Sequence, residues 1–453
     1  MKVLRISVTK LFGMFERHTI ELRTDKRITI IFGPNGIGKT IILNMIDGLF
    51  NANYSVFKIP FEEFIIDFDN GSRIRIVQKS EPDQPLSCIY GELGIGERSF
   101  PLIDIDNQDI RDLQRRLLPY LTNRIPGLEY QGNNTWQYPT GEILSSIELT
   151  ERLRGGPVPD KALADLAKLS QAGPDWFAEI QKSFPRTRLI RTQRLSRLIP
   201  VESSGYSRQS TGKTEIPTVK VYSEELAKKM SAMYDEYGAI SQKLESTFPS
   251  RVFDYVTPTD SLAMYDELRR QLEILSQKRA NLQAVGLVEG EELKIPERIE
   301  DDNRRNFFNG VLAVYVKDAH DKLRIFDDLA RRIELFKRNI NSRFSFKQLK
   351  VTKNEGFVFE TPSGNRLLPT DLSSGEQHEL VLNYELLFKI DPHSLILIDE
   401  PELSLHIAWQ QQFLDDLLET TDIGNFQVVV ATHSPDIIHD HWDLTVDLGE
   451  SAT

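Results

Sequence analysis

The chain has 453 residues, of which 40% are hydrophobic and 27% are charged, and its formal net charge is −12. This composition is typical of a globular protein of two or three domains, and the acidic balance argues against nucleic acid covering the whole surface. The single cysteine, Cys88, excludes an internal disulfide framework and fits a reducing compartment. We find no signal peptide and no apolar run of about 18 residues, so the sequence predicts a cytoplasmic protein without a membrane span.

The first motif is a glycine-rich loop between a short apolar stretch and an amphipathic one. A GxxxxGK[ST] pattern follows a predicted strand at 28–32, precedes a predicted helix, and comprises Gly33, Pro34, Asn35, Gly36, Gly38, Lys39 and Thr40. In such a P-loop, backbone amides at a helix N-terminus cradle phosphate groups. Lys39 is expected to neutralise phosphate charge and Thr40 to hold Mg²⁺, so ATP and Mg²⁺ are the predicted cofactors.

Two apolar stretches near the end of the chain lead into polar residues. A predicted strand at 394–398 ends at Asp399 and Glu400, and a second at 426–431 precedes His433. We expect Asp399 to support the Mg²⁺ held by Thr40 indirectly or through a water molecule, and Glu400 to polarise the attacking water. His433 is expected to reach the γ-phosphate, so Glu400 and His433 are the predicted catalytic residues.

A third motif, LSSGE at 372–376, opens a predicted helix about 20 residues before the predicted strand at 394–398, which fits a Walker B strand. Ser373 and the amide of Gly375 would present hydrogen-bond donors to an anion at the helix N-terminus. A serine N-cap alone explains the same residues. The position ahead of the Walker B-like strand favours the nucleotide-binding interpretation.

The middle of the chain has a different character. Helical stretches are predicted near 109–121 and 160–184, followed by a strand near 189–192 and a polar linker that contains a second GKT without a preceding strand. Beyond Tyr222, heptad seams interrupted at Pro249 and Gly286 predict a short helical hairpin or bundle. The expected organisation is an N-terminal half of an ATPase head, a mixed lobe, a linker, a helical insertion and a C-terminal half of the head, at 1–100, 101–200, 201–219, 220–343 and 344–453.

Together these motifs resemble the ABC-type ATPase heads of the RecF, SMC and OLD families. The resemblance implies an α/β P-loop fold, with a mixed sheet and flanking helices, split by a helical, short coiled-coil insertion. It also implies a head-to-tail homo-oligomer in which Ser373 and Gly375 of one subunit cap the ATP held by Lys39 of another. Ser374 and Glu376 depart from the usual signature, His406 stands where transporters have aspartate, and Gln78 is the candidate Q-loop glutamine.

Within this superfamily, TQRL before the helical insert and EPELSLH after the strand resemble the ATPase subunits of bacterial anti-phage systems, AriA of PARIS and next PtuA of Septu. The resemblance implies a slowly hydrolysing sensor and scaffold that controls a separate effector, a Toprim nuclease, and responds to a phage-encoded trigger protein.

Two other functions remain open from the sequence. One is a DNA-repair or DNA-binding ATPase of the RecF and SMC type, for which the arginines at 186–197 could contact phosphate or pair with acids. The other is an autonomous nuclease, whose carboxylates would be Asp67, Asp69, Asp104 and Asp106, although alternating acids more often form a solvated edge. No HNH cluster or cysteine–histidine metal spacing is found, and the residues after His433 leave no room for a Toprim domain, so we do not expect this chain to be the toxin.

Overall fold

The computed structural model forms two compact units, Met1–Gln193 with Lys389–Thr453 (unit 1) and Arg194–Phe388 (unit 2). Each unit is treated by itself below. The residues described are 1–51, 54–78, 86–92, 96–102, 108–125, 127–132, 135–137, 143–145, 149–150, 153, 158–170, 174–190, 196–200, 213–255, 261–288, 302–403 and 405–449.

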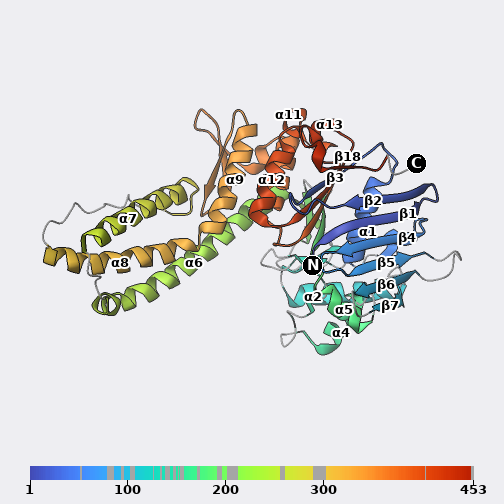
Figure 1. Cartoon of the computed structure of the whole chain (residues 1–453), viewed down its shortest axis with the longest axis horizontal. Helices are drawn as coiled ribbons and strands as arrows, with labels where there is room; N and C mark the ends of the chain where they lie inside the picture. Colours follow the sequence, from blue (N-terminus) through green and yellow to red (C-terminus); the bar gives the residue numbers. More distant parts are fainter. Residues whose placement is uncertain are drawn as a thin grey trace, which may run out of the picture. The chain divides into compact units, whose positions relative to one another are not determined.

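Unit 1 contains a parallel sheet built from strands that are far apart in sequence (Figure 1). Its order is β11 (Thr187–Ile190), β17 (Leu395–Asp399), β18 (Gln427–Thr432), β3 (Ile28–Phe32) and β19 (Thr445–Asp447). The central strands are nearly continuous apolar runs because a parallel sheet is buried on both faces. The strand expected near 189–192 is thereby confirmed for 189–190, begins earlier at Thr187, and has its last two expected residues outside the described residues.

A second, antiparallel sheet of unit 1 has the order β2-β1-β4-β5-β6-β7. Its strands alternate buried and exposed residues, as expected for a sheet with one covered face. Helix α1 (Lys39–Phe50) contributes Met45, Ile46 and Leu49 to a core that also contains residues of both sheets. The antiparallel strands are β1 (Val3–Leu11), β2 (Phe15–Glu21), β4 (Glu63–Phe68), β5 (Arg73–Val77), β6 (Ser87–Glu92) and β7 (Gly96–Pro101).

The remaining elements of unit 1 are mostly short. The predicted helix near 109–121 is confirmed as α2 (Gln108–Arg124), whereas the stretch 160–184 holds two helices, α4 (Asp160–Ser170) and α5 (Asp175–Gln181). Pro174 precedes α5 as its N-cap, and its fixed backbone suits the start of a new helix rather than the interior of one long helix. The others are η1 (Tyr54–Lys58), β8 (Glu129–Gly132), β9 (Thr135–Gln137), β10 (Ile143–Ser145), η3 (Pro401–Leu403), α11 (Ile407–Gln410), α12 (Phe413–Gly424), α13 (Pro435–Ile438) and η4 (Trp442–Leu444).

Unit 2 is dominated by long helices, and α6 (Thr218–Phe253), α7 (Ser261–Ala284) and α8 (Asp302–Arg324) run alongside one another (Figure 1). The predicted break at Gly286 is confirmed, because this residue follows α7 with a φ of 80°. The predicted break at Pro249 is wrong, since α6 continues to Phe253. Pro249 lies near the helix end, where Arg251 pairs with Asp318 of α8 and holds the last turn in place.

The rest of unit 2 surrounds a small antiparallel sheet. Strands β14 (Gln348–Thr352), β15 (Gly356–Glu360) and β16 (Arg366–Leu367) precede η2 (Pro369–Asp371) and α10 (Ser374–Phe388). The seam expected to run through residues 316–340 is divided, because α8 ends at Arg324 and α9 covers Asp327–Arg343. Of the expected linker, 201–212 lie outside the described residues, and β13 (Lys213–Pro217) pairs with β12 (Ser196–Pro200).

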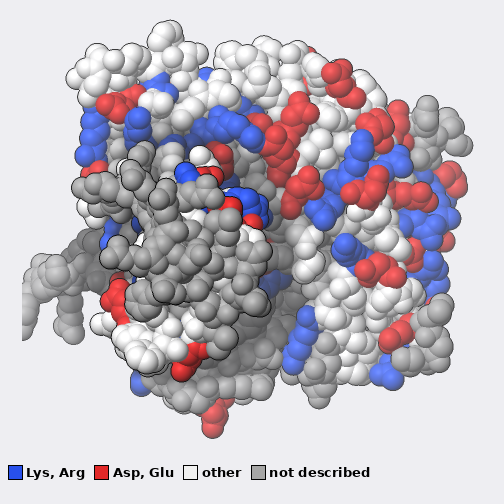
Figure 2. All heavy atoms as spheres, turned by 60° about the vertical axis from the view of Figure 1, so that its left-hand side comes forward, with Lys and Arg blue, Asp and Glu red and all other residues white. Residues whose placement is uncertain are grey.

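These elements confirm the predicted fold class, an α/β P-loop fold with a parallel sheet and a helical insertion. The five expected domain segments stay a prediction. On the face shown in Figure 2, lysine and arginine side chains are interspersed with aspartate and glutamate over the described surface. Among the described residues, none of the helices combines the length and the apolar character that a membrane span requires.

Candidate nucleotide site

Three strands of the parallel sheet end side by side. Strand β18 pairs with both β17 and β3, so that Asp399 lies opposite Ala431 and Thr432 lies opposite Phe32. The residues that follow these strands therefore emerge at one edge of the sheet. Open α/β sheets bind ligands outside the carboxyl ends of their strands. The fold thus places the glycine-rich loop, the paired carboxylates and the histidine around a single position.

The glycine-rich loop has a backbone that only glycine adopts without strain. Gly36 and Gly38 have φ values of 86° and 104°, and Gly38 is the N-cap of α1. A Cβ added at Gly38 would lie 2.5 Å from the side chain of Leu11. Pro34, Asn35 and Gly36 are exposed. The first turn of a helix has backbone N–H groups without intrahelical partners, so this loop fits an anion such as a phosphate group.

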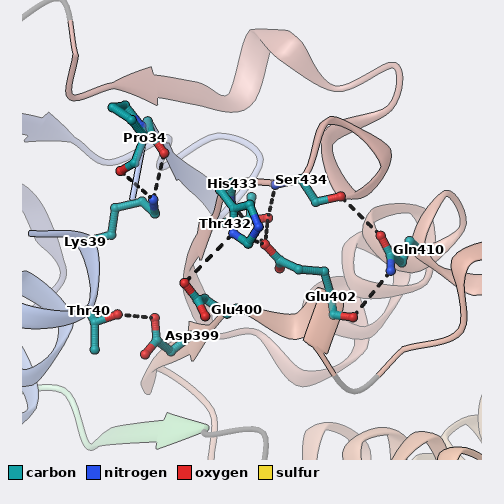
Figure 3. A network of polar contacts seen from close by, with 11 residues as sticks. Pro34, Lys39, Thr40, Asp399, Glu400, Glu402, Gln410, Thr432, His433 and Ser434 are labelled. Atoms are coloured by element: carbon teal, nitrogen blue, oxygen red, sulfur yellow. Dashed lines mark hydrogen bonds and ion pairs between the residues drawn. The ribbon is translucent and has the colours of Figure 1, made fainter. Parts of the chain in front are cut away.

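The lysine of the loop is buried, with 5% of its surface exposed. Its Nζ donates hydrogen bonds to the carbonyl oxygens of Gly33 at 2.7 Å and Pro34 at 3.1 Å (Figure 3). Burial lowers the pKa of Lys39, and the nearby carboxylates of Glu400, Glu402 and Asp399 oppose that shift. Lys39 is therefore a cation held within the loop next to the acidic end of β17.

The next residue of the loop contacts that strand directly. Thr40 Oγ1 donates a 3.0 Å hydrogen bond to Asp399 Oδ1. A hydroxyl and a carboxylate are the hard oxygen ligands that Mg²⁺ prefers. This donor set fits the predicted metal, and Thr40 and Asp399 are the residues that would hold it, where the ion would neutralise charge on the phosphates.

Glu400 lies in an unusual backbone conformation for a residue with a side chain. Its φ is 46°, and its N–H donates to the carbonyl oxygen of Ala431 at 2.9 Å. Strained positions of this kind persist only where the surrounding structure fixes them, and they cluster at functional sites. The carboxylate is partly exposed and its Oε1 lies 3.9 Å from His433 Nδ1. Glu400 thus presents a carboxylate to solvent next to Lys39 and Asp399, where it can orient a water molecule.

A second acid in this region was not singled out from the sequence. Glu402 is 7% exposed at its side chain, and its Oε1 lies 3.0 Å from His433 Nδ1 (Figure 3). The same oxygen accepts hydrogen bonds from Thr432 Oγ1 at 2.7 Å and from the backbone N–H of His433 at 3.0 Å. The only signal in the sequence is the repeated acid of the DEPE stretch.

The LSSGE segment belongs to unit 2. Ser373 donates from its N–H and its Oγ to Glu376 Oε2, each at 2.8 Å, and Glu376 N–H points back to Ser373 Oγ at 3.4 Å. This is a capping box at the start of α10. Burial alone would raise the pKa of Glu376, but hydrogen bonds from Lys347 and Ser373 lower it. The capping interpretation is therefore present in the structure, and the nucleotide-binding roles of Ser373 and Gly375 stay predictions.

The other candidates from the sequence have structural partners. Gln78 Oε1 accepts a 2.9 Å hydrogen bond from the backbone of Phe61. Asp67 pairs with Arg5 and Arg73, and Asp69 accepts from the backbone N–H of Lys2. Asp104 and Asp106 lie outside the described residues, as do Arg191 and Arg194. No group of three or more His, Cys, Asp or Glu side chains suited to a metal ion is found in the part of the chain that the structure describes.

Comparison of the sequence with known protein families identifies one that matches most of the chain. The model of the AAA ATPase domain family matches residues 1–438. The protein named Retron Vc95 probable ATPase, from Vibrio cholerae, is 25% identical over 169 residues, which are 37% of this chain and 30% of that protein. Retron Ec83 probable ATPase, from Escherichia coli, is 26% identical in an alignment of 153 positions that covers 27% of this chain and 28% of that protein.

Other similarities are shorter or weaker. UvrABC system protein A of Pseudomonas putida is 42% identical over 80 residues, covering 18% of this chain and 8% of that protein. Among solved structures, the SMC head domain from Thermotoga maritima superposes with a TM-score of 0.32 and 11% identity, over 97% of this chain and 93% of that one. The chain thus spans less than a third of the length of the retron proteins it matches.

Proposed function

The chain belongs to the AAA ATPase domain family, and on that premise we propose that it is the ATP-hydrolysing sensor and scaffold subunit of an anti-phage defence complex that controls a separate nuclease effector. The observation that carries the ATPase part is the convergence of the P-loop, the Asp399–Glu400 pair and His433 at one edge of the parallel sheet. These groups have the chemistry that phosphoryl transfer to water requires.

Each residue of the site has a role in this proposal. The P-loop amides and Lys39 would bind the β- and γ-phosphates, and Thr40 and Asp399 would hold Mg²⁺, which would neutralise charge on those phosphates. Glu400 accepts a hydrogen bond from the attacking water and aligns it with the γ-phosphorus. His433 donates a hydrogen bond to a γ-phosphate oxygen. Because these groups position and neutralise rather than form covalent bonds, catalysis rests on their geometry.

The scaffold part of the proposal rests on the signature segment. Ser373 lies exposed at the start of a 15-residue helix, α10, which begins at Ser374. A helix start of this length presents N–H groups and a positive dipole end to an anion. We place it against the γ-phosphate of an ATP bound by a second copy of the chain. ATP binding would then hold two subunits together, and hydrolysis would release them.

The proposal that the nuclease is a separate protein rests on the side chains that the described residues present outside the ATP site. Asp67, an acid that could have served a nuclease, is already paired with two arginines. A two-metal nuclease needs several converging carboxylates, and the described residues hold none outside the ATP site. The partial identity with two proteins named retron ATPases, together with the resemblance to AriA and PtuA, favours a defence complex with a separate Toprim effector and a phage-encoded trigger.

The proposal is tested by expressing the chain alone and together with its neighbouring genes. Alone, the chain should be harmless, hydrolyse ATP slowly and cut neither DNA nor RNA with Mg²⁺ or Mn²⁺. Toxicity should require a second gene and should be lost in Lys39→Ala. The matched control is Lys26→Ala, which removes a lysine that pairs with Asp443 at the surface. Native mass spectrometry of the co-expressed proteins should show this chain bound to the second gene product.

Two outcomes would redirect the assignment. Metal-dependent cleavage by the isolated chain that persists in Glu400→Gln would make it an autonomous nuclease. Tight DNA binding whose affinity falls steeply with salt would indicate many phosphate contacts, and without any second gene product in the mass spectrum it would favour a DNA-binding ATPase of the RecF and SMC type.

A further inference from the structure

A buried carboxylate oxygen accepts two hydrogen bonds from two consecutive residues and lies within ion-pair distance of an imidazole nitrogen. Glu402 Oε1 receives Thr432 Oγ1 at 2.7 Å and the His433 backbone N–H at 3.0 Å, and it lies 3.0 Å from His433 Nδ1. The side chain of Glu402 is 7% exposed, whereas that of His433 is 40% exposed. The acid is thus enclosed, and the imidazole bridges between it and the solvent-facing site (Figure 3).

A ring of hydrogen bonds keeps this acid in place. Ser434 N–H donates to Thr432 Oγ1 at 3.0 Å, and Ser434 Oγ donates to Gln410 Oε1 at 3.1 Å. Gln410 Nε2 donates in turn to the carbonyl oxygens of Glu402 at 3.4 Å and Leu405 at 3.3 Å. The turns after β17 and β18 are therefore joined twice, by Glu402 bonded to Thr432 and His433 and by Gln410 bonded to Ser434.

The contact between Glu402 and His433 favours one position for a proton on the imidazole ring. Glu402 Oε1 is the acceptor in both of its hydrogen bonds, so a proton on the imidazole nitrogen that lies 3.0 Å from it makes this contact favourable. With its proton on Nδ1, the ring of His433 would leave Nε2 for the nucleotide. A histidine whose second nitrogen is held by a carboxylate keeps one tautomer and one orientation.

We propose that Glu402 is a positioning residue that orients His433 and keeps its Nδ1 protonated, so that Nε2 serves the γ-phosphate. This inference rests on the role given to His433 in the proposed function. When Nε2 also donates to a phosphate oxygen, the ring carries a positive charge, which the carboxylate of Glu402 balances. Glu402, in the turn after β17, would thereby orient His433, which follows β18 and contacts the phosphate.

The first test reads the proton directly and needs no enzymatic activity. Nitrogen-15 NMR of the full chain, labelled at its 8 histidines, should show one ring protonated at Nδ1 that disappears in His433→Gln. In Glu402→Gln the amide can present either its oxygen or its NH₂ group to the ring, so the population protonated only at Nε2 should rise. A His433 ring protonated only at Nε2 in the unaltered chain, or a tautomer that Glu402→Gln leaves unchanged, overturns the proposal.

The second test reads turnover. Glu402→Gln should lower kcat roughly 10- to 100-fold, as loss of an orienting partner does elsewhere, while the Kd for ATP stays within about twofold. Asp415→Asn is the matched control, because Asp415 forms another carboxylate–imidazole pair with His441 at 2.9 Å, in α12 and outside the site. It should leave kcat unchanged.

The third test separates failure of this inference from failure of the proposed function. If Glu402 acts through His433, the double variant Glu402→Gln/His433→Ala should be no slower than His433→Ala alone. Full additivity of the two losses overturns the proposal. If His433→Ala itself retains normal kcat, the assignment of His433 to the γ-phosphate fails, and the ring-nitrogen measurement then decides the role of Glu402 by itself.

Discussion

Thr40, in the first turn of α1, donates a 3.0 Å hydrogen bond to Asp399, at the end of β17. The two residues come from opposite ends of the chain and meet because β3 and β17 lie in one parallel sheet with β18 between them. Their oxygens are thus held together at the position where we propose that Mg²⁺ binds. Such preorganisation lowers the cost of fixing an ion in place.

The hydroxyl of Thr40 should therefore be required for Mg²⁺-dependent turnover. Thr40→Val keeps the shape but removes the oxygen, so the Mg²⁺ concentration for half-maximal hydrolysis should rise roughly tenfold or more, as expected when a ligand is lost. Thr40→Ser retains the hydroxyl and is the matched control. A titration of ATP hydrolysis with Mg²⁺ measures the effect, and equal midpoints for Val and Ser would remove Thr40 from the metal site.

Glu400→Gln should stop hydrolysis without emptying the site. The amide cannot accept a proton from the attacking water, and general-base assistance contributes roughly 10²- to 10⁴-fold. ATP should remain bound, because phosphate binding rests on the P-loop and Lys39. Phosphate release gives the rate and a fluorescent ATP analogue gives the Kd. Glu62→Gln alters an exposed acid and should change neither; a wild-type rate in Glu400→Gln would contradict the assigned role.

Mixing two inactive variants should restore activity if Ser373 acts in trans. Lys39→Ala removes the phosphate cation of the P-loop, and Ser373→Arg places a bulky side chain at the start of α10. A mixed dimer has one site with both defects and one with neither, so hydrolysis per dimer should recover toward half the normal rate at most. Two affinity tags verify that the subunits exchange. Without recovery in exchanged, folded dimers, the site would be complete within one chain.

Much of the ATP site is predictable because its parts are local in sequence. The P-loop needs a strand, a glycine-containing turn and a helix in immediate succession, and 28–50 supplies all three. The carboxylates follow an apolar run that can only be a buried strand, and β17 ends at Asp399 as expected. Here the local preferences of the chain and the final fold agree.

Other features depend on contacts that no local pattern contains. Glu402 reads as an ordinary acid after the strand, and its burial against His433 depends on how β17 and β18 pair. Pro249 predicts a helix break, yet α6 continues to Phe253, and its last turn contains Arg251, which pairs with Asp318 of α8. In both cases a tertiary contact decides what the sequence leaves open.

The stability of the chain should fall below pH 6.5 through a buried histidine. His18 of β2 is 1% exposed, and within the described residues neither ring nitrogen has a hydrogen-bond partner. Burial lowers the pKa of His18 below the 6.5 of an unfolded chain. Since the unfolded state then binds more protons, this contribution is fully present above pH 6.5 and is lost as the pH falls, by at most about 1.4 kcal/mol per pH unit.

Denaturant unfolding at several pH values measures this effect. In His18→Leu the free energy of unfolding should lose this part of its pH dependence between pH 6.5 and the lowered pKa. His320→Gln replaces an exposed histidine of α8 and should keep the original profile. Parallel profiles for the unaltered chain and His18→Leu would show that His18 remains uncharged or finds a partner on protonation.

Within unit 2, Gly356 meets the backbone of Ser223 so closely that a side chain cannot fit. The Oγ of Ser223 accepts from the Phe357 N–H at 2.9 Å and donates to the carbonyl oxygen of Glu355 at 2.6 Å, which holds α6 against β15. A Cβ on Gly356 would lie 1.8 Å from the Ser223 carbonyl oxygen. Gly356→Ala should therefore separate the two elements, and the cost should exceed about 3 kcal/mol, in the upper range for single substitutions.

Gly364→Ala is the control that separates this clash from backbone strain. Gly364 has a φ of 80°, similar to the 70° of Gly356, but nothing lies within 4 Å of a Cβ built on it. Its substitution should cost only about 1–2 kcal/mol, the price of a left-handed conformation. Denaturant unfolding of the two variants gives both values. Equal losses would mean that α6 and β15 move apart easily, and the close approach of Ser223 to Gly356 would then contribute nothing to holding the insertion on its sheet.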